Sequence, residues 1–522
     1  MHIHNRAALA QPVDVAFPTR MSEGHAPIPA NLFGIRFEDR TPHSLFGRAI
    51  RTDAEPPPAR PRKPRVSAAK ALEAARYDLA ERDPDLSALR TITWAQILAG
   101  LLVVGALVWA VLRDAAQVWS IVHLVGLCMF AFVIMIRLFA AAVSLAPPRV
   151  LPAQWTKPAP IYTILCPLFR EARVAEDLVA ALDRLDYPKD RLDIKLVLEE
   201  DDLETITAIA RMGLRPPFSL CIVPSAPPQT KPKALNYALA HAQGEFVVVY
   251  DAEDAPDPAQ LWAALDAFAA DPDLACVQAP LRIDNARARW ISGQFAAEYA
   301  VQFDAILPLL TRLRLPVPLG GTSNHFRTEV LRRLGAWDPF NVTEDADLGY
   351  RLAREGWRTG MIAPPTWEEA PVSLGAWLKQ RTRWIKGHMQ TWLVLMRTPF
   401  RTAGEMGLIP FLSIQFVLLA GVLAAFAHGP LAAALLAALL SPANLLSPAD
   451  LALAIAGYCT AIYGALAAAA ATRDIGLARS ALTMPLYWPL STIAAFRALI
   501  ELITRPHHWA KTEHGVSWRL AR

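Results

Sequence analysis

Long apolar segments near both ends of the chain limit what it can fold into. Thr91–Leu112 contains no charged residue, and Val118–Ala146 contains only Arg137. An apolar segment of about 20 residues is long enough to cross a lipid bilayer as a helix. Leu408–Ala427 and Leu451–Ala471 have the same character. We therefore expect membrane helices on both sides of a central region that is not itself membranous.

The composition supports a membrane protein with a soluble part. Of the 522 residues, 53% are hydrophobic, which is high for a purely soluble enzyme. The formal net charge of +4 is small, and no basic stripe with interleaved aromatic residues occurs, so a nucleic-acid partner is not expected. The five cysteines never form a CxxC pair, which favours reduced thiols over a disulfide framework. The N-terminal residues lack the apolar run of a signal peptide, so secretion is not expected.

The distribution of Lys and Arg predicts the orientation of the membrane segments. Residues 428–450, between the last two apolar segments, contain no Lys or Arg. Basic residues occur on the other flanks: Arg82, Arg90, Arg149, Lys157, Arg397, Arg401, Arg473 and Arg479. Because cytoplasmic flanks are the ones enriched in Lys and Arg, the central region should be cytoplasmic and residues 428–450 external. The chain is thus predicted to be a multi-pass protein of the bacterial inner (plasma) membrane.

These features divide the chain into five parts. Residues 1–66 are rich in Pro and Arg without apolar periodicity, and residues 67–89 are expected to form a short charged helix. Ala481–Ile503 is apolar enough to cross the membrane, but Pro485 and Pro489 interrupt it. We favour a re-entrant or interfacial hairpin there, with a full crossing as the alternative. The expected parts are a largely disordered cytoplasmic arm (1–90), two transmembrane helices (91–146), a soluble domain with an interfacial helix (150–400), transmembrane or interfacial helices (405–503) and a cytoplasmic tail (504–522).

Strand and helix patterns alternate through the first half of the soluble part. Between the strands lie amphipathic segments such as Ala172–Leu185 and Pro232–Gln243. This alternation predicts an α/β fold with a mostly parallel sheet and right-handed crossovers. The expected strands are Ile161–Pro167, Ile194–Leu198, Leu220–Val223, Phe246–Tyr250 and Leu274–Gln278.

Acidic residues follow three of these strands. They are Glu171 after the first strand, Glu199–Asp202 after the second and Asp251–Asp254 after the fourth. The carboxyl ends of parallel strands meet at the ligand-binding edge of such a sheet, so these side chains should converge there. Any one cluster, taken alone, could instead be a solvated turn or a helix N-cap.

Asp251 and Glu253 are the strongest candidates for a metal site. Alternation along a strand places both side chains on one side, where they could hold the same Mg²⁺ or Mn²⁺ ion. Such cations combine one or two carboxylates with substrate phosphates. Lys231 and Lys233 could add positive charge near those phosphates, although a lysine pair at a helix start is also ordinary. Neither GxxxxGK(S/T) nor GxGxxG occurs, so P-loop hydrolysis and dinucleotide redox chemistry are not indicated.

Three motifs follow one another in an order that resembles family 2 glycosyltransferases, the processive membrane synthases related to cellulose and hyaluronan synthases. Asp251-Ala-Glu253 looks like the family's DxD metal motif, with Glu in the second acidic place. Thr343-Glu-Asp345 looks like its TED motif, and Gln380-Arg-Thr-Arg-Trp384 matches QxxRW. The resemblance covers about residues 158–400 and implies a cytoplasmic, Rossmann-like GT-A domain.

The resemblance also implies roles for single residues. Asp345, with Glu344 beside it, would be the base that deprotonates an acceptor hydroxyl, whereas Gln380, Arg383 and Trp384 would contact the acceptor and the diphosphate. Plainer explanations exist: Thr343 could cap a helix over Glu344–Glu355, and QxxRW could be an interfacial helix with a snorkelling Arg. The residues expected at the nucleotide-sugar donor are Glu171, Glu200, Asp201, Lys233, Asp251 and Glu253.

Two further segments resemble loops of the same family. Gly320–Arg327 is similar to the acceptor-side loop, although it could also be a turn with incidental polar residues. The tail Trp509–Gly515 loosely resembles the gating loop, which implies that it folds over the bound nucleotide from the cytoplasmic side.

The resemblance therefore implies an inverting glycosyltransferase. It would use a nucleotide-diphosphate sugar, expected to be a UDP-sugar, to extend a β-linked polysaccharide at the cytoplasmic face. Two alternatives remain: a non-processive transferase that acts on a lipid-linked acceptor, and a non-catalytic scaffold with a decayed transferase domain. The expected partners are the donor, a growing glycan or lipid-linked acceptor, membrane lipid and export proteins.

Overall fold

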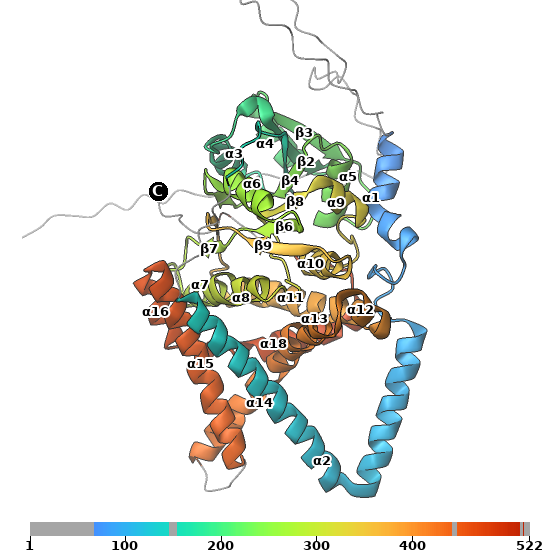
Figure 1. Cartoon of the computed structure of the whole chain (residues 1–522), viewed down its shortest axis with the longest axis vertical. Helices are drawn as coiled ribbons and strands as arrows, with labels where there is room; N and C mark the ends of the chain where they lie inside the picture. Colours follow the sequence, from blue (N-terminus) through green and yellow to red (C-terminus); the bar gives the residue numbers. More distant parts are fainter. Residues whose placement is uncertain (1–66, 146–153, 441–445, 512–514, 516–522) are drawn as a thin grey trace, which may run out of the picture. The chain divides into compact units, whose positions relative to one another are not determined.

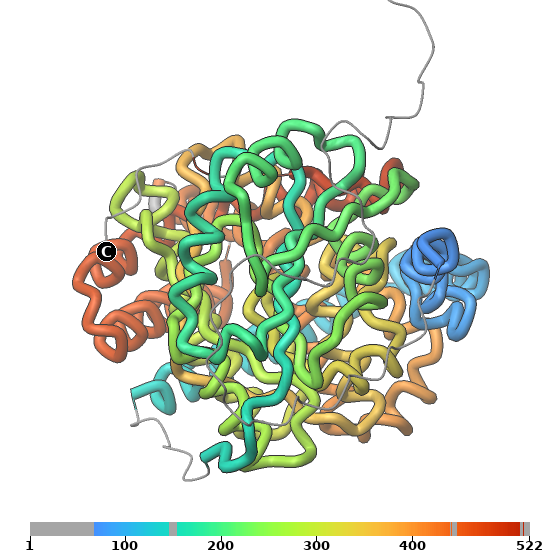
Figure 2. The backbone as a smooth tube through the Cα atoms, turned by 90° about the horizontal axis from the view of Figure 1, so that it is seen from above, coloured from blue at the N-terminus to red at the C-terminus, as the bar shows by residue number. Residues whose placement is uncertain are grey.

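The computed structural model describes residues 67–145, 154–440, 446–511 and 515. The arm expected at residues 1–66 lies outside the described residues. Helix α1, Ala68–Arg82, is the short charged helix that we predict within residues 67–89. It begins at Ser67, whose side chain accepts a hydrogen bond from the N–H of Lys70 (3.3 Å). Seen from above, α1 (blue) lies at the edge of the soluble domain (Figure 2).

Helix α2, Trp94–Ser144, contains both of the first two expected membrane segments. Its backbone is helical except at Asp114, where φ is −155° and ψ is 90°, and the chain reverses direction there (Figure 1). The Asp114 side chain accepts a hydrogen bond from the N–H of Gln117 (2.9 Å) and so caps the second half of the hairpin. The turn is therefore shorter than residues 113–117, which separate the two apolar segments in the sequence.

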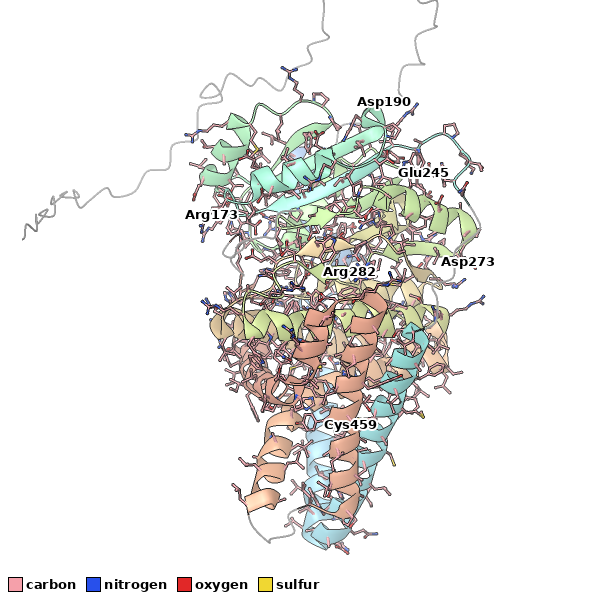
Figure 3. The ribbon with its side chains drawn as sticks, turned by 90° about the vertical axis from the view of Figure 1, so that its left-hand side faces the viewer. Arg173, Asp190, Glu245, Asp273, Arg282 and Cys459 are labelled. Carbon is pink, nitrogen blue, oxygen red and sulfur yellow. The ribbon has the colours of Figure 1, made fainter. Side chains whose placement is uncertain are left out.

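The next two candidate membrane segments form one long helical stretch and a second helix that follows it. The long helical stretch comprises α13 (Leu408–Ile414), the π-helical segment η3 (Gln415–Leu419) and α14 (Ala420–Leu440), and the second helix is α15 (Pro448–Thr472). The external linker predicted at residues 428–450 is too long, because α14 continues through Pro430 into an Ala- and Leu-rich stretch that favours helix. Figure 3 shows these helices projecting away from the sheets, with Cys459 on α15.

Four helical stretches of the described chain are long and apolar enough to cross a membrane: Trp94–Ser144, Leu408–Ala438, Pro448–Thr472 and Met484–Thr504. The last of these is divided into α17 (Met484–Tyr487) and α18 (Leu490–Thr504), preceded by α16 (Ile475–Ala481). Helix α16 packs on α7, and Lys511, which follows α18, pairs with Glu171 (3.1 Å). Both ends of this segment therefore contact the soluble domain, which supports the re-entrant hairpin; that hairpin stays a prediction.

The soluble domain is built on a mixed seven-stranded sheet in the order β3-β2-β1-β4-β8-β6-β9. All five expected strands are present, and β1, β2, β3 and β4 are mutually parallel neighbours, for example with Cys166 opposite Leu196. The strands are β1 (Tyr162–Leu168), β2 (Leu192–Glu199), β3 (Phe218–Val223), β4 (Phe246–Val249), β6 (Leu274–Gln278), β8 (Asn324–Arg327) and β9 (Arg358–Met361).

Strand β8 was not expected, because its sequence is polar. It lies antiparallel between β4 and β6, where Asn324 and His325 are buried. His325 lies 2.8 Å from the hydroxyl of Tyr162 and 3.1 Å from Oε1 of Gln260. These partners satisfy both ring nitrogens, so a polar residue can occupy a strand at the centre of the sheet.

A smaller sheet and the remaining helices complete the domain. Strands β5 (Ala255–Pro256), β10 (Thr366–Glu368) and β7 (Leu281–Ile283) form the small sheet in that order. The helices are α3 (Ala175–Asp183), η1 (Lys189–Arg191), α4 (Leu203–Arg211), α5 (Lys231–Ala240), α6 (Gln260–Ala270), α7 (Trp290–Val301), the π-helical η2 (Gln302–Ile306), α8 (Leu307–Arg312), α9 (Thr328–Arg333), α10 (Glu344–Arg354), α11 (Leu374–Leu395) and α12 (Pro399–Met406).

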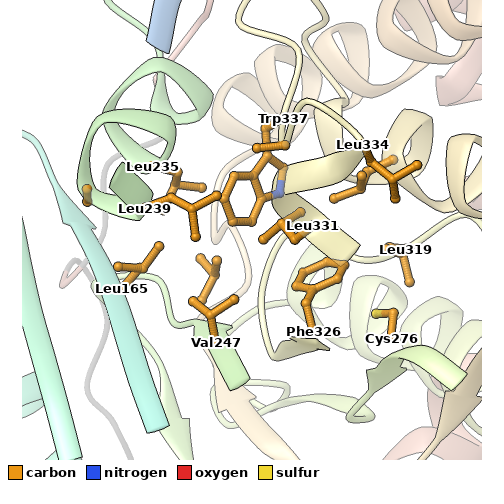
Figure 4. Close-up of a cluster of buried hydrophobic side chains, with 14 of the residues drawn as sticks. Leu165, Leu235, Leu239, Val247, Cys276, Leu319, Phe326, Leu331, Leu334 and Trp337 are labelled. Carbon is orange, nitrogen blue, oxygen red and sulfur yellow. The ribbon is translucent and has the colours of Figure 1, made fainter. Parts of the chain in front are cut away.

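Two apolar clusters cover the two faces of the main sheet. In one of them Trp337 packs with Leu235, Val247, Phe326 and Leu331 (Figure 4). This cluster joins α5 and α9 to β4 and β8, so it fixes the start of α5 relative to the carboxyl ends of the strands. Helix α11, the predicted interfacial helix, lies beneath the domain and packs on α18.

Candidate functional site

One cavity of about 890 Å³ extends from the carboxyl ends of the strands into the candidate membrane helices. Its walls include Asp251 after β4, Asp345 in α10 and Arg383 in α11. These three side chains come from motifs that lie far apart in the sequence, and the fold brings them to a shared cavity. Glu171, Glu253, Glu344, Gln380 and Trp384 also line it.

Lys231 links the first acidic motif to the second. Its Nζ lies 2.5 Å from Oδ1 of Asp251 and donates a hydrogen bond to the carbonyl of Gly321 (2.6 Å). A Cβ atom at position 321 would lie 3.3 Å from Oδ2 of Asp345 and 3.8 Å from Nζ of Lys231. The absence of a side chain at Gly321 therefore lets the Lys231 ammonium and the carboxylates of Asp251 and Asp345 lie close together.

The electrostatic surroundings of Lys231 confirm that it sits among acids. Burial alone lowers the pKa of its ammonium, but the carboxylates of Asp251, Glu344 and Asp345 outweigh burial and hold the pKa above its usual value. The group is therefore charged at neutral pH. The Lys231 ammonium neutralises part of the negative charge of the Asp251, Glu344 and Asp345 carboxylates.

Four carboxyl groups crowd the end of β4 and the neighbouring β10. Burial and the charges of Asp251, Glu253 and Glu368 raise the pKa of Asp254 well above its usual range. Burial and Glu253 do the same for Glu368. Asp254 is fixed by hydrogen bonds from Thr322 and from the N–H of Asp251 (2.7 Å). Such mutual repulsion is relieved when a cation binds.

This donor set fits a hard divalent cation. No group of three or more His, Cys, Asp or Glu side chains in the described residues has the spacing of a complete metal cage. A nucleotide-bound Mg²⁺ or Mn²⁺ does not need one, since one or two carboxylates suffice when phosphates and water supply the other ligands. Oδ1 of Asp254 is buried and accepts no hydrogen bond from the described residues, so acceptor capacity is left over at this place. Asp251 and Glu253 are the side chains that would hold the ion.

Glu344 and Asp345 begin helix α10. Oδ1 of Asp345 accepts a hydrogen bond from the N–H of Ala346 (2.8 Å), so the first turn of the helix orients its carboxylate. Burial and the charge of Asp345 raise the pKa of Glu344 to about 8, and burial raises the pKa of Asp345. Thr343 occupies the N-cap position of α10, as the alternative interpretation expects, but its side chain makes no capping hydrogen bond within the described chain.

Arg383 and Trp384 line the cavity from α11. Arg383 donates a hydrogen bond to the carbonyl of Val342 (3.3 Å), and its guanidinium carbon lies 4.5 Å from the ring centroid of Trp509. Nε of Arg383 is buried without a partner among the described residues, as is Oε1 of Gln380. Both atoms are free to bind a ligand in the cavity.

The orientation of Trp384 depends on residues that the sequence did not reveal. Arg381 lies 4.8 Å from the Trp384 ring centroid and forms two hydrogen bonds with Glu298 (2.8 and 2.6 Å). The hydroxyl of Tyr487 donates a further hydrogen bond to Glu298 (2.9 Å). Tyr299 stacks on Trp384 with a centroid distance of 6.1 Å. This aromatic and charged group ties α11 to α7 and to α17.

Three residues predicted at the donor are not brought into the cavity. The ammonium of Lys233 is buried and pairs with Glu199 (2.7 Å), so Lys231, two residues earlier, takes the place expected for it. Glu200 and Asp201 are exposed, where they accept hydrogen bonds from the N–H of Ser225 (3.2 Å) and from Gln229 (2.8 Å).

The described part of the tail closes one side of the cavity. Trp509 and Lys511 line it, and Lys511 pairs with Glu171 (3.1 Å). The N–H of Gly515 donates a hydrogen bond to Glu369 (2.6 Å). Residues 512–514 of the expected gating loop lie outside the described residues. Of the expected acceptor-side loop, Gly320, Gly321 and Thr322 line the cavity.

Residues 158–387 match the model of the family described as glycosyltransferase like family 2. The chain is 26% identical over 249 residues to the probable glycosyltransferase YdaM of Bacillus subtilis (strain 168), covering 47% of this chain and 59% of YdaM. It is 28% identical over 294 residues to the beta-monoglucosyldiacylglycerol synthase of Synechocystis sp., covering 54% and 60%. It is 26% identical over 242 residues to the poly-beta-1,6-N-acetyl-D-glucosamine synthase of Staphylococcus aureus (strain COL), covering 46% and 57%.

The chain thus covers less than two thirds of these relatives. A mannosyltransferase of Pyrobaculum calidifontis, PcManGT, solved in complex with GDP-Man and Mn²⁺, aligns with a TM-score of 0.47 at 21% identity, over 73% of this chain and 97% of that one. The family match identifies residues 158–387 as a family 2 glycosyltransferase domain. The predicted fold class, a GT-A domain with a mostly parallel sheet and flanking membrane-type helices, is confirmed.

Proposed function

We propose that this chain, which carries a family 2 glycosyltransferase domain over residues 158–387, is an inverting glycosyltransferase of the inner membrane. It transfers a sugar from a nucleotide-diphosphate donor, a UDP-sugar, to an acceptor hydroxyl. The observation that carries the proposal is the shared cavity of Asp251, Asp345 and Arg383, which continues between the membrane helices. A donor bound at the strand ends and an acceptor that enters from the membrane would meet there.

Asp345 is the general base in this proposal. A base must reach the acceptor hydroxyl and be unprotonated when it acts. The first turn of α10 fixes the Asp345 carboxylate, and Lys231 beside it favours the charged form. The carboxylate takes the proton as the hydroxyl oxygen attacks the anomeric carbon from the side opposite to the leaving diphosphate, which inverts the configuration.

The leaving diphosphate requires positive charge. Lys231 and Arg383, which both line the cavity, supply it. A divalent cation held by Asp251 and Glu253 supplies further positive charge to the diphosphate when bound. With the donor in place, the ammonium of Lys231 can exchange Asp251 for a phosphate oxygen.

The acceptor that we propose first is the end of a growing β-linked glycan. Trp384 lines the cavity, and sugar rings stack well on aromatic side chains. The cavity then runs between α2, α14 and α15 as far as His123 and Asp450, whose side chains lie 2.6 Å apart. A path of this length supports extension of one chain, with the glycan passing between the protein's own helices.

A lipid-linked acceptor is the second candidate. The relative from Synechocystis is named a beta-monoglucosyldiacylglycerol synthase, and most of the cavity wall at the level of the membrane helices is apolar. In both cases the sugar is added on the cytoplasmic side, because the basic flanks of the membrane segments lie with the soluble domain.

Product analysis separates the candidates. Purified enzyme with Mn²⁺ and a panel of radiolabelled nucleotide sugars is expected to form a glycan ladder from one donor. A single added sugar on extracted lipid would select the second candidate. No labelled product with any donor, together with unchanged glycan output in cells that carry Asp345→Asn, would favour a non-catalytic scaffold and contradict the proposal.

A further inference from the structure

Arg137 is a charged residue within a membrane-spanning segment, and it faces the cavity. It lies in the second half of α2 and is one of the residues that line the cavity. Its guanidinium carbon lies 5.4 Å from the ring centroid of Trp488. No hydrogen bond or ion pair joins it to any residue in the described part of the chain. An arginine at membrane depth is costly unless a partner compensates its charge.

The carboxylate of Glu298, which acts electrostatically on Arg137, already has hydrogen-bond partners. Glu298 is the acid whose charge acts on Arg137, but it forms both of its short hydrogen bonds with Arg381 (2.8 and 2.6 Å) and accepts a third from Tyr487. Arg381 therefore occupies the Glu298 carboxylate, and Arg137 forms no ion pair with any carboxylate of the described residues. A half-buried arginine without an ion pair among the described residues is suited to bind an anion from outside the chain.

The surroundings of Arg137 indicate what carries that anion. Trp488 packs with His428 (4.8 Å between ring centroids) and with Tyr458 (5.9 Å), forming an aromatic wall beside the guanidinium. The walls beyond this point are mainly apolar. They include Leu127, Phe130, Val133, Ile134, Leu431 and Leu453. A hydrocarbon chain gives up no hydrogen bonds to water when it lies along such walls.

We propose that Arg137 binds the phosphate group of a membrane lipid whose hydrocarbon chains lie along this apolar wall. A guanidinium binds a phosphate through two parallel hydrogen bonds, which is the geometry that an unpaired arginine offers. The inference goes beyond the proposed function, because it concerns the membrane half of the cavity and requires no turnover. In the second candidate function this site would anchor the lipid.

Lipid retention measured by native mass spectrometry tests this proposal. The full chain is released from detergent after titration with phosphatidylglycerol, or with a diacylglycerol that has the same chains and no phosphate. The wild type is expected to retain phosphatidylglycerol at least about tenfold better than diacylglycerol, and Arg137→Gln to lose this preference. Arg113→Gln is the matched control, since Arg113 lies on the same helix and over a tryptophan (4.9 Å to the ring of Trp109) but does not line the cavity.

Other outcomes overturn the proposal. Equal retention of phosphatidylglycerol by the wild type and Arg137→Gln would do so. Displacement of the lipid by millimolar inorganic phosphate would show a site for free phosphate instead. If Arg137→Gln does not fold, Arg137→Lys carries the test: it keeps the charge but loses the paired hydrogen bonds, so it should retain less lipid than the wild type. Because no donor is present, failure here leaves the glycosyltransferase proposal untouched, and absence of transfer leaves this inference untouched.

Discussion

The ammonium of Lys231 lies 2.5 Å from Oδ1 of Asp251, in the place where the proposed cation would bind. In the ion-free protein the lysine therefore offsets part of the charge of the acidic motifs. The two cations should compete for the same carboxylate, since each lowers the benefit that the other gains from it. This competition can be measured.

Replacing Lys231 with Met should tighten Mn²⁺ binding, by about tenfold or more, because Asp251 loses its competing partner. Asp251→Asn should weaken Mn²⁺ binding by at least as much. Titration calorimetry without nucleotide measures both. Lys233→Met is the matched control, since the ammonium of Lys233 pairs with Glu199 and should leave the affinity for Mn²⁺ unchanged. Weaker binding in Lys231→Met would contradict the competition.

The sequence alone does not predict which of Lys231 and Lys233 faces the cavity. Residues two apart on a helix point to different sides, but both sides of α5 are buried, so its pattern does not reveal which lysine faces the cavity. Asp251, Asp345 and Arg383 could be predicted because each lies in a motif with a fixed place in the fold. Glu298 and Tyr487 belong to no motif, and they meet only because α7 and α17 pack together.

Strand β8 could not be predicted for a related reason. A sequence pattern reports burial only for apolar residues, and His325 is buried in a strand through its polar contacts with Tyr162 and Gln260. The five apolar strands and the membrane segments were predictable because their amino-acid composition is apolar over a characteristic length.

The acidic limb of the pH–rate profile should lie above the usual carboxyl range. Burial raises the pKa of Asp345, and the base acts only when deprotonated, so the rate should increase as the pH rises through this raised pKa. Lys231 lowers the pKa of both Glu344 and Asp345, so Lys231→Met should move the limb to still higher pH. The measurement is kcat/KM against pH at saturating Mn²⁺. A limb below about pH 4, the value of a free aspartate, would argue against this account.

Glu298→Gln should raise the KM for the acceptor by about tenfold, because Arg381 loses a charge-assisted pair and no longer holds Trp384. Nucleotide binding should not change. Glu405→Gln removes a comparable bond, to Arg354 (2.6 Å), outside the cavity and serves as the control. A fall in kcat with no change in KM would show that Glu298 acts in another way.

We propose that Asp345 deprotonates the acceptor over a donor held at Asp251. The most direct test of this role is the transfer rate of Asp345→Asn, measured with radiolabelled donor beside the affinity of the same protein for UDP and Mn²⁺. We expect a loss of about 10²-fold to 10⁴-fold in rate with nucleotide affinity unchanged. Transfer at the wild-type rate would contradict it.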